Sequence, residues 1–268
     1  MNSKLMPWAL MLLLALPGVS QAALLSRLGG QAYYDTVLDI TWLADANLAD
    51  SNAFGVDGDI NVNGSMHWNE ANNNWIAAMN ADGGTGYLGF DDWRLPTLSP
   101  ISGGPSFQYD FRNNGTADHG YGATGIGWRT GAGDFVSEMG YMYYVNMARL
   151  GLCTPDNNAP AGCTVQPGVG PRNNHPFANL QLSHYWTGLE FSGLEIAPDP
   201  PHAWYFAFSG GIQGAVKEQV NFFFAWPVRS GDVAVPVPLP TMAIPFGICL
   251  MGLIGVNRGK LRMDASAI

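Results

Sequence analysis

The chain has 268 residues, of which only 12% are charged, and its formal net charge is −9 at neutral pH. Because binding to phosphates needs clustered Lys and Arg, which the body of this acidic chain lacks, the composition argues against a nucleic-acid partner. The 34 glycines and the 12% of aromatic residues favour a loop-rich fold with β-structure over a helical bundle.

Residues 1–22 have the pattern of a secretory signal peptide. Lys4 precedes an apolar run from Met6 to Val19, and the small residues Ser20 and Ala22 form a site for signal peptidase. The alternative is a membrane anchor, but this run contains prolines and is shorter than the roughly 20 apolar residues that span a bilayer. We therefore expect cleavage after Ala22 and export of the remaining chain.

Residues 33–43 place β-branched and aromatic side chains around Asp35 and Asp39. This pattern predicts two short strands joined by a turn.

The segment between Asp59 and Glu70 has the sharpest local pattern. Asp59, Asn61, Asn63, Gly64 and Glu70 fit the spacing of a calcium loop, in which alternate oxygen-bearing side chains surround one cation. Runs of Asn, Asp and Gly also form ordinary turns, and Glu70 is well placed to cap the helix that follows. Calcium held by Asp59, Asn61, Asn63 and Glu70 is thus one hypothesis, and a structural turn is the other.

Two helices are predicted from apolar residues that recur at helical spacing. The first ends at Asp82-Gly83-Gly84, and the second extends from Ser137, the expected N-cap, to Gly151. The apolar stripe of the first helix comprises Trp68, Ala71, Trp75, Ile76 and Met79. We expect both stripes to face the core.

Asp91, Asp92 and Arg94 lie beside Trp93, and their opposite charges predict a structural ion pair within a loop. The five histidines lack the spacing of zinc ligands, and no Gly-x-Ser-x-Gly motif occurs. We therefore expect a protein that is not an enzyme.

Cys153 and Cys163 bracket a short loop, whereas the third cysteine, Cys249, lies in the C-terminal apolar segment. In an exported protein the first two are expected to form a disulfide. The alternative, a metal site, needs more ligands nearby.

The later part of the body has the character of strands, at residues 185–188, 204–208 and 222–228, with a turn at Ser209-Gly210-Gly211. A twisted antiparallel sheet with two helices and long loops, an α+β fold, follows. Alternation places most of the aromatic residues in the core, and a sugar-stacking platform is the alternative. The residues concerned are Trp186, Trp204, Tyr205 and Trp226.

The C-terminal region combines a Pro-rich linker at residues 233–240, an apolar segment at 241–257 and a basic tail at 258–268. The apolar segment is expected to be a transmembrane helix with its tail in the cytoplasm; the alternative is a buried core helix. The order of Val237-Pro238-Leu239-Pro240, apolar helix and basic end resembles the PEP-CTERM sorting signal. This resemblance implies an exosortase as processing enzyme, an inner-membrane anchor, and delivery to the cell surface or extracellular matrix.

Residues 23–232 resemble the Lcl C-terminal domain family. The resemblance rests on the order of five segments, which are Leu38 to Leu43, Trp68-Asn69-Glu70-Ala71, Asp91-Asp92-Trp93-Arg94-Leu95-Pro96-Thr97, Tyr185-Trp186-Thr187 and Ala225 to Arg229. It implies a C-type-lectin-like fold and, for the collagen-like adhesin that names the family, binding to sulfated polysaccharide.

The sequence therefore predicts a non-enzymatic surface or matrix protein that binds a glycan, such as a polysaccharide, or a neighbouring surface component. Two alternatives stay open. One is an exported enzyme on a lectin-like scaffold, and the other is a purely structural matrix component. A clustered acid–base pair or a metal in one pocket would favour an enzyme, and an exposed aromatic groove without titratable groups would favour binding.

Overall fold

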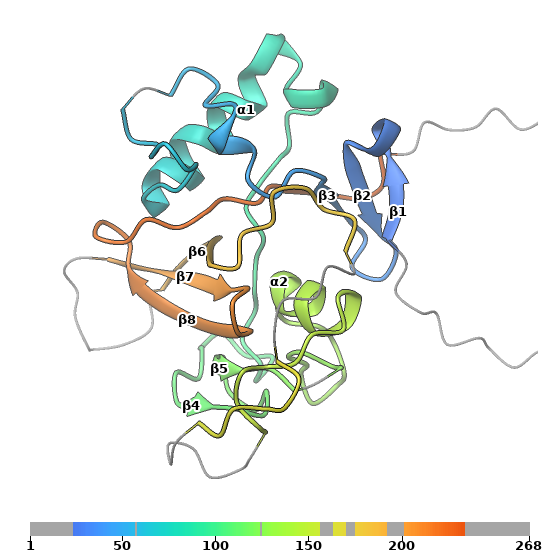
Figure 1. Ribbon diagram of the computed structural model, residues 1–268, viewed down its shortest axis with the longest axis vertical. Helices are drawn as coiled ribbons and strands as arrows, with labels where there is room; N and C mark the ends of the chain where they lie inside the picture. The colour runs from blue at the N-terminus through green and yellow to red at the C-terminus, as the bar shows by residue number, and fades with distance from the viewer. Residues whose placement is uncertain are drawn as a thin grey trace, which may run out of the picture. The chain divides into compact units, whose positions relative to one another are not determined.

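A computed structural model of the chain describes residues 24–56, 58–123, 125–155, 163–169, 175–191 and 201–233. Within these ranges the fold is mixed α+β, with two sheets and two short α-helices, so the predicted class is confirmed (Figure 1). No helix in the same ranges is long and apolar enough to cross a bilayer. The predicted signal peptide, the linker after Val233, the transmembrane helix at 241–257 and the basic tail at 258–268 lie outside the described residues.

The first sheet is antiparallel and begins with the predicted hairpin. Its strand order is β1-β2-β3-β9, and the strands are β1 (Leu24–Arg27), β2 (Ala32–Asp35), β3 (Ile40–Leu43) and β9 (Val228–Ser230). The Asp35 carboxylate accepts hydrogen bonds from the Val37 and Leu38 N–H groups, which folds the turn between β2 and β3. The two strands and the turn predicted at residues 33–43 are thereby confirmed.

The second sheet has the order β4-β5-β8-β7-β6, and only its β4–β5 pair is parallel. Its strands are β4 (Phe111–Arg112), β5 (His119–Tyr121), β6 (His184–Phe191), β7 (His202–Ala207) and β8 (Ile212–Lys217). The predicted turn at residues 209–211 joins β7 to β8, with Gly211 at φ +80°. The prediction of a single antiparallel sheet is wrong, because β3 pairs with β9 and the first four strands named above form a sheet separate from β4 to β8.

The strand predicted at residues 222–228 is also wrong for most of its length. Only Val228 enters a strand, whereas Phe223 and Phe224 make isolated bridges to Met66 and Tyr185. Residues 222–227 therefore link the start of the first helix to β6 through isolated bridges and form no strand of their own.

The first predicted helix is present and presents the predicted stripe to the core. It consists of a π-helical turn at Glu70–Trp75 followed by α1 (Ile76–Ala81). Trp68, Ala71, Trp75, Ile76 and Met79 are all buried. A 3-10 turn at Asp82–Gly84 ends the helix, with Gly83 at φ +56°, where an L side chain is strained. The other short 3-10 turns in the described residues are Leu28–Gly30, Leu48–Asp50 and Tyr87–Gly89.

The second helix begins where the sequence predicts but ends early. The Ser137 hydroxyl accepts a hydrogen bond from the Gly140 N–H, so Ser137 is the N-cap of α2 (Glu138–Tyr141). A π-helical turn at Met142–Asn146 completes the helix. The predicted extension to Leu150 is wrong, because Ala148 has φ +48° and the chain leaves the helical conformation before it.

Aromatic rings fill the main core, whereas Trp204 lies in a second, smaller hydrophobic cluster with Leu98 and Ala215. Trp186, Trp204 and Trp226 have no exposed surface, and Trp42 lies against Trp226 with a centroid distance of 4.7 Å. The alternation argument is therefore right for these tryptophans, and they do not form an exposed sugar-stacking platform.

The charged residues around Trp93 form ion pairs, but not with one another. Arg94 binds Glu138 through both of its terminal nitrogens, and Arg229 binds both carboxylate oxygens of Asp92. The prediction of a structural role is consistent with this arrangement, whereas the expected pairing within the loop is wrong. The partners come from α2 and β9, which the local sequence does not indicate.

Cys153 and Cys163 form the predicted disulfide, with their Cα atoms 5.0 Å apart. The backbone beside it is also paired, since Cys153 bridges to Val165. The cross-link therefore closes a loop at the edge of the domain.

Replacing both Cys153 and Cys163 by serine is expected to lower the free energy of unfolding by about 2–3 kcal/mol, because the open loop gains conformational entropy in the unfolded state. Urea denaturation under oxidising conditions measures the change. Reduction of the wild-type protein should reproduce the loss, and it should not alter the double variant. Equal stability of the oxidised wild type and the variant would contradict the prediction.

Candidate functional site

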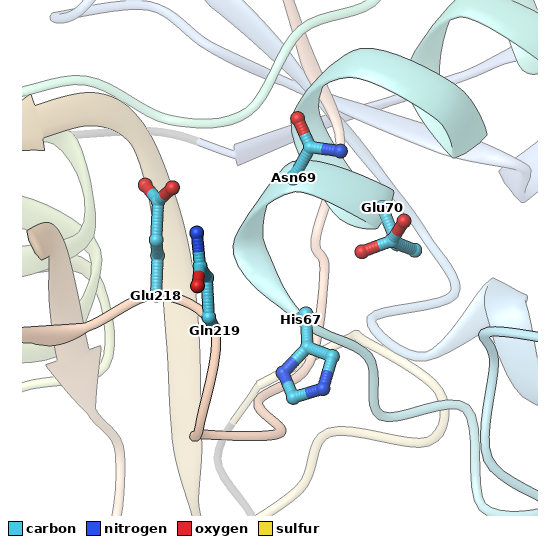
Figure 2. A pocket seen from close by; sticks show the side chains of 5 residues that line it. All are labelled: His67, Asn69, Glu70, Glu218 and Gln219. Carbon is cyan, nitrogen blue, oxygen red and sulfur yellow. The ribbon is translucent and has the colours of Figure 1, made fainter. Parts of the chain in front are cut away.

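A polar cavity of about 380 Å³ lies between the start of the first helix and the segment that follows β8. Figure 2 shows Glu218 and Gln219 on one chain segment, opposite the residues His67, Asn69 and Glu70 on the other. All five lining side chains carry hydrogen-bonding groups, and this volume is within the usual range of small-molecule sites. Of the two cavities described here, this one offers more polar side chains to a ligand.

Long-range hydrogen bonds hold the two sides of the cavity together. Met66 and Phe223 exchange both of their backbone hydrogen bonds, and the Trp68 indole N–H donates to the Thr187 carbonyl at 2.7 Å. The helix therefore starts in a fixed position against β6 and the 222–224 segment. This contact between distant parts of the chain creates the cavity.

His67 is fixed by a hydrogen bond and by an aromatic contact. Its Nδ1 lies 3.0 Å from the Asn221 carbonyl oxygen, and because a carbonyl only accepts, this nitrogen carries the proton. The ring of Phe222 contacts the imidazole at a centroid distance of 3.9 Å, with the two ring planes tilted by 35°, yet 48% of Phe222 is exposed. An apolar ring therefore lies in contact with a residue of the cavity lining.

The two carboxylates of the lining differ in their surroundings. Glu70 accepts a hydrogen bond from the Asn74 side chain at 3.2 Å. Glu218 is only 7% exposed, and its Oε2 has no hydrogen-bond partner among the described residues. Burial raises the pKa of Glu218, and the negative charge of Glu190 raises this pKa further. Glu70 is therefore fixed by a hydrogen bond from a neighbouring side chain, whereas Glu218 is buried and one of its oxygens lacks a donor among the described residues.

The predicted calcium loop takes the form of a hydrogen-bonded turn. The Asn61 amide donates to the Ser65 hydroxyl, and Asn63 Oδ1 accepts from both the N–H and the hydroxyl of Ser65. Asp59 is exposed, whereas Glu70 lines the cavity. In the described residues, no group of three or more His, Cys, Asp or Glu side chains is placed to hold a metal ion. Calcium binding by Asp59, Asn61, Asn63 and Glu70 stays a prediction.

Sequence reasoning identified one side of this cavity and missed the other. Glu70 was predicted as a site residue from the calcium-loop spacing, and His67 lies within the same segment. Glu218, Gln219 and Phe222 were not selected, because an isolated Glu and Gln after a strand have no diagnostic spacing. The adjacent polar residues that follow β8, Glu218 and Gln219, give no local signal that distinguishes them from a solvated turn.

A second, smaller cavity of about 180 Å³ lies at the start of α2. Glu138 is the charged residue among its lining side chains, and the Glu138 carboxylate already binds Arg94 and the Thr97 N–H. The other lining residues are Leu38, Thr97, Leu98, Ser99, Phe135, Val136 and Ser137. This cavity therefore offers less to a polar ligand than the first.

The arrangement of the first cavity is the basis for assigning a function. Comparison with known proteins finds no matching family model, curated protein or solved structure.

Proposed function

We propose that this chain is an exported, non-enzymatic surface or matrix protein that binds a carbohydrate in the cavity lined by His67, Asn69, Glu70, Glu218 and Gln219. The observation that carries the proposal is a polar cavity beside the exposed ring of Phe222. Sugars present hydroxyl groups on their edges and apolar CH groups on their faces. Carboxylates and amides bind the first, and an aromatic ring packs against the second.

The sequence ends support the part of the proposal that concerns location. The pattern of residues 1–22 favours export through signal peptidase, and the C-terminal resemblance favours exosortase handling at the inner membrane. The resemblance of residues 23–232 to a lectin-like family favours a carbohydrate as the ligand. A C-type-lectin-like fold and delivery to the surface or matrix belong to the same proposal.

A glycan-array screen of the purified full chain tests this function, with calcium in one run and a chelator in the other. We expect reproducible binding to at least one class of sugar. Loss of binding on chelation would also support the Asp59 to Glu70 calcium loop, whereas equal binding would exclude a requirement for calcium. Absence of binding under both conditions would overturn the proposal and leave a structural role.

The Phe222→Ala variant is expected to bind the sugar up to about tenfold more weakly, because it removes the apolar face while leaving the polar lining intact. Isothermal titration calorimetry measures this change. Ile126→Ala is a suitable control, since 46% of Ile126 is exposed and it does not line the cavity. Unchanged affinity in Phe222→Ala would show that this ring does not contact the sugar.

A further inference from the structure

The charge of the cavity restricts the class of sugar that it accepts. Two of its five lining residues are glutamates, and none is Lys or Arg. Glu190 lies close enough to Glu218 to act on it electrostatically. Sulfate or carboxylate groups on a ligand would face like charges, which costs binding free energy. A positively charged group on the ligand would instead be attracted by the two glutamates.

The burial of Glu218 provides a second and independent reason. A carboxylate that is shielded from water and has an unoccupied acceptor position destabilises the protein until a donor reaches it. Oε2 of Glu218 is in this situation within the described part of the chain. A ligand ammonium group would donate a charge-assisted hydrogen bond, which is stronger than a bond from a neutral hydroxyl.

The opposite side of the cavity supplies the remaining contacts. The Asn74 amide orients Glu70 from the following helical turn, and the Asn73 amide does the same for Asn69 at 2.8 Å. The half-exposed ring of Phe222 contacts His67, a third residue of the lining. The ligand that complements these groups is a small molecule with a positive charge, hydroxyl groups and an apolar face.

Resting on the proposed carbohydrate function, we infer that the cavity recognises an amino sugar with a free amine, whose ammonium group binds the Glu218 carboxylate. Such a residue occurs in polysaccharides built from glucosamine that is not N-acetylated. N-acetylation removes the positive charge and adds bulk at the same atom. The acetylated and free forms are therefore the natural pair of ligands for a comparison.

Calorimetry with glucosamine and N-acetylglucosamine oligosaccharides of equal length tests the inference on the full chain. We expect at least tenfold tighter binding of the free-amine form at low salt, and a loss of this preference as the salt concentration rises. Equal binding of the two forms would overturn the inference and keep carbohydrate binding. Absence of binding to these and to every other sugar would overturn the proposed function itself.

Variants separate recognition at this site from general attraction to an acidic protein. Glu218→Gln keeps the size of the side chain but removes its charge, so the preference for the free amine should fall below about threefold. Glu70→Gln should reduce it in the same way, and this variant serves if Glu218→Gln does not fold. Asp134→Asn removes an exposed negative charge outside the lining and should keep the full preference. A preference that survives in both glutamate variants would overturn the inference.

Discussion

Replacing Trp226 by alanine is expected to lower the free energy of unfolding by about 4 kcal/mol, because it removes a large buried side chain and leaves a cavity in the core. Trp226 is fully buried, and its ring lies 4.7 Å from those of Trp42 and Phe177. Its indole N–H donates to the Leu43 carbonyl at 2.8 Å. The variant therefore also leaves a buried acceptor without its partner.

The position of Trp226 makes this loss larger than that of an average core residue. Trp42 belongs to β3 of the first sheet, whereas Tyr185, whose ring centroid lies 6.0 Å from that of Trp226, belongs to β6 of the second. Urea denaturation followed by circular dichroism measures the effect. An unchanged slope of the unfolding free energy against urea concentration would show that the variant still unfolds from the same compact state. Phe222→Ala, at a half-exposed ring, should cost less than about 1 kcal/mol. A loss at Trp226 below about 2 kcal/mol would contradict the packing described.

The elements predicted correctly are those determined by neighbouring residues. The hairpin of β2 and β3 depends on alternation and on the Asp35 turn, all within residues 32–43. The first helix depends on the spacing of its apolar stripe and on the glycines that end it. The division into two sheets was not predicted, because the pairing of Ile40 with Ser230 has no local signal.

The same distinction explains what the sequence revealed of the cavity. The calcium-loop spacing singled out the segment from Asp59 to Glu70, which contains three of the five lining residues. The contact that completes the site joins His67 to Asn221, which are 154 positions apart in the chain. Glu218 is held by its own long-range contact, because its N–H donates to the Pro201 carbonyl at 3.1 Å, and the residues adjacent to Glu218 do not indicate this partner.

The Glu138→Ala variant is expected to lose about 3 kcal/mol of unfolding free energy, the second-largest effect, because it leaves a partly buried guanidinium without its carboxylate. The two oxygens of Glu138 lie 2.7 and 2.8 Å from the terminal nitrogens of Arg94, and one of them also accepts from the Thr97 N–H. Arg94 in turn exchanges two backbone hydrogen bonds with Val228. Glu138 therefore links the start of α2 to the segment that supports β9.

The Arg229–Asp92 pair is the comparison, since it is also held by two hydrogen bonds, of 2.7 and 2.9 Å, although Arg229 uses Nε and one terminal nitrogen where Arg94 uses both terminal nitrogens. The Asp92 side chain is 49% exposed, compared with 14% for Glu138, whereas the Arg229 side chain is less exposed than that of Arg94, at 13% compared with 35%. Water replaces an exposed carboxylate at little cost, and Arg229 keeps its position over the Phe90 ring at 4.3 Å. Asp92→Ala should therefore cost at most about 1 kcal/mol. Equal losses in the two variants, measured by thermal and urea unfolding, would show that burial of the carboxylate does not determine the strength of these pairs.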